Sequence, residues 1–317
     1  KILTEEGTPA DPVVTFNTHL KMLESFFKIV LVGASQDVIE LINNLVVETY
    51  ERKGITETTD CSNFKAEDFP LFSDLLETLQ AKDKESMDSL TLRDMRTAEL
   101  YLQKFVTGRY SDIWNAPSTL KTDASIIDFN FQSLFANKNN VVANSQMLLV
   151  FRFIEQEVIN AREMNRYGKN LHTLIIVDEG HLFIDAKFPI ALYFFYQMSK
   201  RIRKYNGSFI PATQNIADWN ANEELRSKTS AIIKNSQYLF IFKLAAPDMK
   251  DVLDVYKAGD SFNEEEQRMI ISAVTGQAFF VGSTELRACI RIRAGKYARG
   301  LFEERKAEKE TAAELSE

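Results

Sequence analysis

Hydrophobic and polar residues follow a helical rhythm through the first third of the chain. In residues 35–53 the apolar side chains recur every three or four positions, which predicts an amphipathic helix. The same spacing follows Pro70, which can open a helix, and the pair Thr91 and Asp94, which resembles a helix cap. The pattern predicts a packed bundle of helices without a cofactor site.

After Pro117 short apolar runs alternate with longer helical stretches. We expect strands near residues 125–131, 174–177, 208–212 and 238–244, and helices near residues 144–165, 188–205 and 223–235. Ser261 and Glu264 resemble a capping box that opens one more helix, and a hairpin is expected over residues 277–292. Strands alternating with helices are typical of a parallel sheet covered on both faces, so we predict an α/β fold.

The composition is that of an ordinary globular protein. Of the 317 residues 45% are hydrophobic and 26% are charged, which excludes a disordered or collagen-like chain. Two cysteines cannot form a disulfide framework, and three histidines leave little for a zinc site. The longest apolar stretches are shorter than the ~18 residues of a membrane span, so we expect no membrane span in this chain.

Charge divides the chain into an acidic and a basic part. Residues 20–100 hold 9 Lys and Arg against 16 Asp and Glu, whereas residues 200–250 hold 9 against 4. The net charge of −7 excludes a uniformly basic coat for nucleic acid. A local basic strip at residues 200–250 stays compatible with binding an anionic partner.

The most informative segment is an apolar run followed by two acids. Leu174–Val177 predicts a buried strand, and Asp178 and Glu179 come directly after it. Ligands of parallel sheets bind at the carboxyl ends of the strands, where this pair would lie. The arrangement is that of a Walker B motif, in which Asp178 would serve Mg²⁺ and Glu179 would polarise the attacking water. The alternative is a strand that ends in an exposed acidic turn.

Two later segments add polar groups at element ends. Lys200–Lys204 closes the predicted helix with basic residues, which is either a favourable interaction with the helix dipole or an arginine finger for a neighbouring subunit. Thr213 and Gln214 follow the predicted strand at residues 208–212, as an ordinary turn or as a sensor of the γ-phosphate. Together the three segments support a nucleotide site more strongly than any one of them does alone.

With these residues in place, the sequence resembles the conjugative type IV secretion ATPases of the VirB-four and TraC type. The resemblance is carried by Asp-Glu at 178–179, Arg-Lys-Tyr at 203–205 and Thr-Gln at 213–214, and it covers roughly residues 15–300. A histidine-bearing helix opens an all-helical insertion in this family, and the predicted helix around His19 resembles it. The motif set is shared with coupling proteins and HerA/FtsK relatives, and the helical insertion favours the secretion ATPase.

The resemblance implies a RecA-like P-loop NTPase core with a mostly parallel sheet and an inserted all-helical subdomain. Residues 1–18 would be a remnant of the core edge, 19–118 the all-helical subdomain, 119–300 the RecA-like core with Walker B, and 301–317 a charged tail. Such ATPases work as homo-oligomeric rings, usually hexamers, beside the channel components of the secretion system. The implied location is cytoplasmic and peripheral to the cell membrane.

The resemblance also implies roles for single residues, with ATP and Mg²⁺ as the cofactors. Asp178 would hold Mg²⁺ through water, and Glu179 would be the catalytic base. Arg203 would be the arginine finger, with Arg201 as its less favoured substitute. Gln214 would sense the phosphate, with Thr213 beside it at the nucleotide.

One departure from the family pattern concerns the phosphate loop. No glycine in the 317 residues fits Gly-x-x-x-x-Gly-Lys-Ser/Thr, whose backbone N–H groups and lysine hold the phosphates. In the family this loop lies upstream of the point that corresponds to Lys1. We therefore expect the chain to be most of an ATPase domain without its first strand and phosphate loop, and to hydrolyse no ATP by itself.

Two other functions stay open at this point. A DNA translocase or coupling protein of the same superfamily would bind DNA through the basic strip at residues 200–250, with strong salt dependence. A non-catalytic interaction module could have kept the fold, in which case the parent protein would also lack a phosphate loop. The transported substrate and the host system are not encoded in any motif of this chain.

Overall fold

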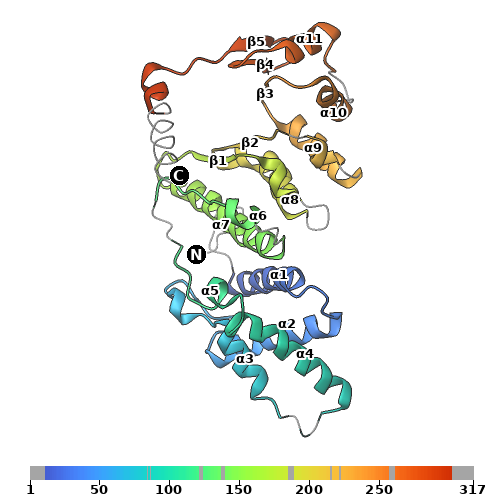
Figure 1. Cartoon of the computed structure of the whole chain (residues 1–317). Coiled ribbons are helices and arrows are strands. Elements are labelled where there is room, and N and C mark those ends of the chain that lie inside the picture. Colours follow the sequence, from blue (N-terminus) through green and yellow to red (C-terminus); the bar gives the residue numbers. More distant parts are fainter. Residues whose placement is uncertain are drawn as a thin grey trace, which may run out of the picture. The chain divides into compact units, whose positions relative to one another are not determined.

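The computed structural model describes residues 11–83, 85, 87–120, 124–136, 140–184, 189–214, 216–220, 223–256 and 261–301 (Figure 1). Its α-helices are α1 (Pro12–Val30), α2 (Gln36–Arg52), α3 (Phe72–Gln80), α4 (Ser89–Val106), α5 (Ser111–Trp114), α6 (Gln132–Ala136), α7 (Asn140–Arg166), α8 (Ile190–Arg201), α9 (Glu223–Asn235), α10 (Ala246–Tyr256) and α11 (Glu264–Ser272). Short 3-10 helices are η1 (Ala66–Asp68), η2 (Gly180–Phe183), η3 (Ile202–Tyr205) and η4 (Ala217–Asn220), and the strands are β1 (Thr173–Val177), β2 (Gly207–Pro211), β3 (Leu239–Ile241), β4 (Gln277–Val281) and β5 (Arg287–Arg291).

The chain divides into two compact units. The first unit comprises Lys1–Ile176, Lys187–Phe194 and Arg201–Ile210, and the second comprises Val177–Ala186, Phe195–Lys200 and Pro211–Glu317. The division passes through β1, α8 and β2, so these elements contribute residues to both units. The domain boundaries expected from the sequence, at residues 18, 118 and 300, stay predictions.

Helix α2 begins and ends as its apolar spacing predicts. The Ser35 side chain caps it by accepting a hydrogen bond from the Val38 N–H at 3.3 Å. Its buried face includes Ile42 and Leu45, both no more than 1% exposed. Gly54 follows the helix with φ +75°, a left-handed conformation that glycine adopts without steric cost.

The cap predicted at Thr91 and Asp94 is wrong by one turn. Helix α4 begins at Ser89, and the carboxylate of Asp88 accepts the Leu90 and Thr91 backbone N–H groups at 2.9 and 3.1 Å. The Thr91 hydroxyl donates to the same carboxylate at 2.6 Å. These hydrogen bonds hold the pKa of Asp88 below its usual value. A charged carboxylate is a stronger acceptor than a threonine hydroxyl, so the helix starts three residues earlier.

The capping box predicted at Ser261 and Glu264 is displaced by two residues. The Asn263 side chain accepts from the Glu266 N–H at 2.9 Å, and the Glu266 carboxylate accepts from the Asn263 N–H at 2.9 Å. Both patterns place a small polar residue three positions before a glutamate. The reciprocal bonds decide between them, and α11 starts at Glu264.

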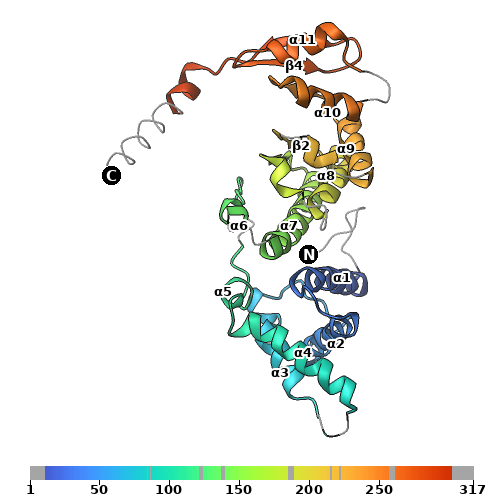
Figure 2. The ribbon, with the colours of Figure 1, turned by 45° about the vertical axis from the view of Figure 1, so that its right-hand side comes forward.

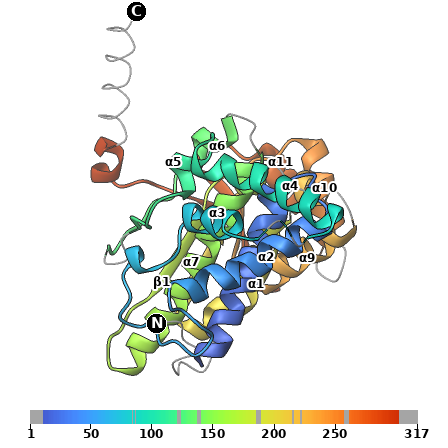
Figure 3. The same cartoon turned by 90° about the horizontal axis from the view of Figure 1, so that it is seen from below.

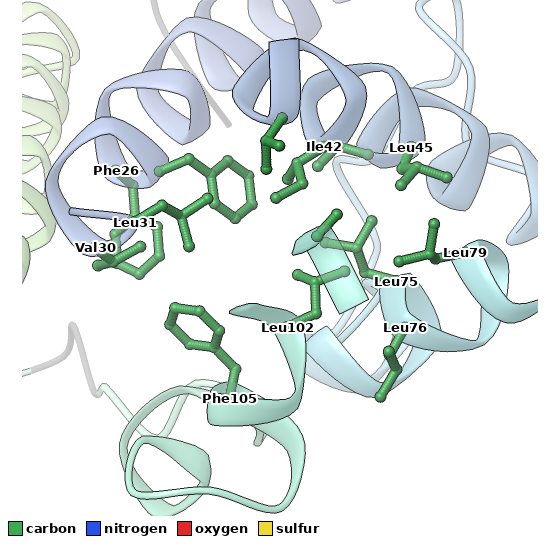
Figure 4. Packing of buried hydrophobic residues seen from close by; sticks show 14 of the residues in the cluster. Phe26, Val30, Leu31, Ile42, Leu45, Leu75, Leu76, Leu79, Leu102 and Phe105 are labelled. Atoms are coloured by element: carbon green, nitrogen blue, oxygen red, sulfur yellow. The ribbon is translucent and has the colours of Figure 1, made fainter. Parts of the chain in front are cut away.

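The first unit contains a helical core, as the apolar spacing predicts. Helices α1 to α4 pack against one another, with α1 and α2 side by side (Figure 3). Figure 4 shows their buried side chains directed toward one another: Phe26, Val30, Leu31, Ile42, Leu45, Leu75, Leu76, Leu79, Leu102 and Phe105. Phe105 is fully buried and stacks on Phe72 with the ring centroids 4.5 Å apart. Burying a side chain of this size stabilises the fold by about 1.5–3 kcal/mol.

The strand predicted at residues 125–131 is absent from the structure. The described residues before α6 form no regular element, and Ile126 is 87% exposed. A lone extended segment has no neighbouring strand to satisfy its backbone, so apolar content alone does not make it a strand.

Strands β1 and β2 form a two-stranded sheet and run parallel. The Thr173 N–H donates to the Asn206 carbonyl before β2, and the Ala212 N–H donates to the Val177 carbonyl beyond its end. Along β1, Ile175 and Val177 are buried whereas Leu174 and Ile176 are exposed. The prediction of a strand buried on both faces is therefore wrong for the described residues.

Strands β3, β4 and β5 form a separate antiparallel sheet in the second unit. Phe240 pairs with Phe280, and Phe280 pairs with Ala288. Helices α10 and α11 lie beside this sheet, where Phe262 and Phe279 share a small core (Figure 2). The hairpin is as predicted, but only β1 and β2 are parallel among the described strands. The expected mostly parallel sheet is corrected to one parallel pair and one antiparallel sheet.

An ion pair fixes α11 to the end strand of this sheet. The Arg287 guanidinium donates to the two oxygens of Glu266 at 2.6 and 2.8 Å, and it lies over the Phe262 ring. Arg287 thereby lowers the pKa of the Glu266 carboxyl.

Among the described residues no helix combines the length and apolar character needed to cross a membrane.

Candidate functional site

The two acids predicted to carry chemistry lie at the turn that follows β1. Asp178 is exposed, and its carboxylate accepts the Glu179 backbone N–H at 3.0 Å. Glu179 has φ 50° and ψ 45°, a left-handed conformation that is uncommon for a residue with a side chain. This conformation turns the chain sharply at the strand end and starts η2 at the next residue.

Gly180 lets this turn approach the segment that follows β2. Its N–H donates to the Ala212 carbonyl at 2.7 Å, next to the bond from Ala212 to Val177 at 2.8 Å. A Cβ at Gly180 would lie 2.9 Å from Cζ2 of Trp219 and 3.1 Å from the Ala212 carbonyl oxygen. Only glycine fits there, so the turn after β1 and the segment after β2 are held in contact.

The contact brings together two of the predicted site residues. The Gln214 side-chain amide donates a hydrogen bond to Oε1 of Glu179. The two residues are 35 positions apart in sequence. Thr213 is half-buried beside Gln214 at the same end of β2. Asp178, Glu179, Thr213 and Gln214 are thus neighbours in the second unit.

Trp219 forms the buried wall of this region. It is 3% exposed, contacts Phe195 with ring centroids 5.6 Å apart, and its carbonyl accepts the hydroxyl of buried Thr229 at 2.8 Å. These contacts tie η4 to α9 and fix the indole against Gly180. No sequence pattern singles out Trp219, because its position depends on contacts between distant segments.

His181 is a second residue whose place the sequence does not reveal. Its Nδ1 lies 3.4 Å from Oε2 of Glu179. The sequence allows either a nucleotide contact or an ordinary packed or solvated histidine. The structure places the ring beside the other carboxylate oxygen of Glu179.

The two arginines predicted as fingers belong to the first unit. Arg201 ends α8 and Arg203 lies in η3, and both are exposed. Buried Tyr205, in the same short helix, lies under the guanidinium of Arg162 at 5.2 Å. The role of Arg203, or of Arg201 as its substitute, as a finger toward the nucleotide of a neighbouring subunit stays a prediction.

The donor set around Asp178 suits magnesium better than zinc. No group of three or more His, Cys, Asp and Glu among the described residues could hold a metal by itself. Magnesium keeps several waters and is commonly bound by one or two carboxylates together with substrate phosphates. The exposed carboxylate of Asp178 fits that requirement.

Known proteins resemble this chain in sequence and in structure. No protein-family model matches the chain. The sequence is 27% identical to Protein TraC of Escherichia coli (strain K12) over 194 residues, which are 60% of this chain and 21% of TraC. The solved structure of VirB4 of Thermoanaerobacter pseudethanolicus aligns with a TM-score of 0.73 and 25% identity, covering 89% of this chain and 71% of that one.

A more distant match is the plasmid coupling protein TrwB, solved in complex with ADP and Mg²⁺. It aligns over 91% of this chain and 70% of its own with 9% identity and a TM-score of 0.47.

The match to VirB4 defines the fold class: the chain has an α/β fold that resembles the fold of VirB4. Together with the match to TraC, it shows that the chain is similar to VirB4 and TraC in sequence and in fold. The chain spans about one fifth of the length of TraC.

Proposed function

We propose that this chain forms the Walker B side of an ATPase that powers transfer through a type IV secretion system. The observation that carries the proposal is the hydrogen bond between Gln214 and Glu179 at the ends of two parallel strands. An acid that follows a strand and is held by a polar side chain from the adjacent strand end can orient a water for attack on a phosphate.

Each site residue has a role in this proposal. Glu179 accepts a proton from the attacking water, and Gln214 holds the carboxylate and responds to the γ-phosphate. Asp178 holds Mg²⁺ through water, with Thr213 beside the nucleotide, and the ion would neutralise phosphate charge when bound. Arg203, with Arg201 as its substitute, is proposed to reach the nucleotide of a neighbouring subunit.

The phosphate loop is proposed to come from a segment outside these 317 residues. No Gly-x-x-x-x-Gly-Lys-Ser/Thr sequence occurs in the chain. Without backbone N–H groups and a lysine to hold them, phosphates lack most of their anion contacts. The chain alone should therefore bind ATP weakly and leave it unhydrolysed.

The setting of the protein is proposed from its similarity to VirB4 and TraC. We propose a homo-oligomeric ring, with six subunits, at the cytoplasmic face of the membrane and in contact with the channel components of the secretion system. Pilus assembly and the transfer of DNA or protein are the processes that such a ring would drive.

The test compares ATP hydrolysis by the 317-residue chain with ATP hydrolysis by the full-length protein. The full-length protein is the longest natural polypeptide that contains these residues. We expect the full-length protein to hydrolyse ATP and Glu179→Gln to lower kcat by about 100-fold or more, because a general base contributes about 10²–10⁴-fold. Glu265→Gln, at an exposed position in α11, should leave kcat unchanged. Robust turnover by the 317-residue chain, lost on Glu179→Gln, would contradict the proposed origin of the phosphate loop.

Two assays separate the other functions. A DNA translocase should show DNA binding that falls steeply with salt and depends on basic residues between 200 and 250. A non-catalytic module should show no ATP hydrolysis in the full-length protein, whose sequence would also lack a phosphate loop.

A further inference from the structure

The carboxylate of Glu179 has two oxygens in different surroundings. Oε1 accepts the hydrogen bond from Gln214. Oε2 is a buried atom without a hydrogen-bond partner, and so is Nδ1 of His181. The two unpartnered atoms are 3.4 Å apart.

The number of such atoms at this turn is itself informative. In the described part of the chain six buried side-chain nitrogen or oxygen atoms have no hydrogen-bond partner. Three of them belong to Glu179, His181 and Trp219, which surround Gly180. Buried polar atoms in folded proteins are nearly always paired, so a cluster of unpaired ones marks a place where a bond or a ligand is expected.

The chemistry of the two atoms is complementary. A neutral imidazole donates from one ring nitrogen and accepts at the other, and its neighbours decide which nitrogen carries the proton. A carboxylate oxygen can only accept. A small rotation of the ring shortens 3.4 Å to the 2.7–3.2 Å of an N–H···O bond, which requires the proton on Nδ1.

Resting on the function proposed above, we propose that His181 is a positioning residue for Glu179. Its Nδ1–H donates to Oε2 while Gln214 donates to Oε1, so the carboxylate is fixed from both sides. The Trp219 indole against Gly180 limits movement of the backbone between the two residues. His181 thus aligns the base without itself touching the nucleotide.

The first test reads the tautomer of His181 in the 317-residue chain. The chain has only three histidines, so ¹⁵N spectra of histidine-labelled protein resolve each ring. At pH 7.5 the His181 signals should show a protonated Nδ1, and Glu179→Ala should shift them toward the Nε2–H form. The signals of His172, which bonds to Ser208 at 3.0 Å in the first unit, should not move. Identical His181 signals in both proteins would overturn the proposal.

The second test uses ATP hydrolysis by the full-length protein. His181→Phe keeps the ring shape without a donor, and we expect kcat to fall about tenfold with KM unchanged, the value of a buried hydrogen bond to a charged group. His181→Asn places an amide N–H near the position of Nδ1 and should retain most of kcat. His181→Gln reaches the position of Nε2 instead and should resemble His181→Phe.

A double variant excludes a merely structural role. In the Glu179→Gln background His181→Phe should lower the residual rate no further, because the residue acts through Glu179. An additional loss in that background, or an equal loss for His181→Asn and His181→Phe, would overturn the proposal. A full-length protein without any ATP hydrolysis would refute the proposed function, and the ¹⁵N spectra would still decide whether His181 and Glu179 are paired.

Discussion

The side-chain amide of Gln214 donates a hydrogen bond to the carboxylate of Glu179, and this bond joins the residues that follow two neighbouring strands. Because Gly180 has no side chain, the turn that carries Glu179 lies close enough for the bond to form. The relationship leads to predictions about the site, and the contacts elsewhere lead to predictions about stability.

Gln214→Ala in the full-length protein should lower kcat for ATP by about 10- to 100-fold, because a charged hydrogen bond contributes about 1.5–3 kcal/mol and the base loses its orientation. Gln214→Glu should lower kcat further, since it places a second carboxylate beside Glu179. Gln237→Ala removes an exposed glutamine that donates to the hydroxyl of its neighbour Tyr238, and should leave kcat unchanged. Steady-state kinetics measures each variant, and full activity of Gln214→Ala would refute the assigned role.

Gly180→Ala should destabilise the chain by about 1–3 kcal/mol, the usual cost of forcing an atom into a packed region. The added Cβ would meet the Trp219 ring at 2.9 Å and the Ala212 carbonyl at 3.1 Å. Urea unfolding followed by tryptophan fluorescence gives the free energy. Gly295→Ala is the control, because a Cβ there meets nothing within 4 Å. Equal stability of the two variants would show that the turn relaxes without cost.

Glu266→Gln should cost about 1.5–3 kcal/mol of the free energy of unfolding, because it removes the charge that accepts two bonds from Arg287. The Glu266 and Arg287 side chains are 13% and 15% exposed. Glu264→Gln removes the partner of Arg268 in a pair that is 88% and 79% exposed, and should change stability by less than about 0.5 kcal/mol. Urea unfolding at pH 7.5 measures both.

The same ion pair has a predictable response to acid. The folded pKa of Glu266 is lower than the unfolded value of 4.5, so the unfolded state binds the proton more readily. Its contribution to stability is therefore complete above pH 4.5 and is lost as the pH falls through the folded pKa. The difference between wild type and Glu266→Gln should shrink on acidification, and a difference that stays constant would contradict this linkage.

Because of His19, the folding stability of the first unit should fall in mild acid. Its Nε2 shares a hydrogen bond of 2.7 Å with the hydroxyl of Tyr50, and burial lowers the pKa of the imidazole. Burial, followed by the charge of Cys61, raises the pKa of Tyr50 to about 12. The histidine is therefore neutral in the folded state. Its contribution is complete above the unfolded pKa of 6.5 and is lost as the pH falls through the lower folded value.

The measurement is urea unfolding at pH 7.5 and pH 5.5. Wild type should lose stability between these values, and the double variant His19→Phe with Tyr50→Phe should lose less. His172→Phe alters an exposed histidine and should keep the full drop. A drop of the same size in the double variant would assign the acid sensitivity to other groups.

Periodicity was sufficient to predict elements whose stability is local. Helices α2 and α9 have the predicted extents within one residue, because their apolar faces repeat every three or four positions. The strand before Asp178 and the hairpin of β4 and β5 were also predicted. Helix caps were misplaced by two or three residues because a neighbouring polar residue, Asp88 or Asn263, caps the helix instead.

Features that depend on distant segments were not predictable in the same way. The pairing of β3 with β4 joins residues about forty positions apart, and nothing in the local pattern of residues 238–244 distinguishes a parallel from an antiparallel neighbour. The sequence placed Asp178, Glu179 and Gln214 after strand ends, as the structure has them, and their chemical roles stay predictions. The place of His181 beside Glu179, and of Trp219 against Gly180, follows only once the turn geometry is known.

Because the backbone of Glu179 is left-handed, selection for stability and selection for activity should favour different residues at position 179. A side chain in this conformation costs about 1–2 kcal/mol, which glycine and asparagine largely avoid. A library at position 179 sorted for heat resistance should therefore enrich glycine and asparagine, whereas the same library sorted for the proposed ATPase activity should return glutamate. Enrichment of different residues in the two sorted pools would support the proposed role of Glu179 independently of any kinetic assay.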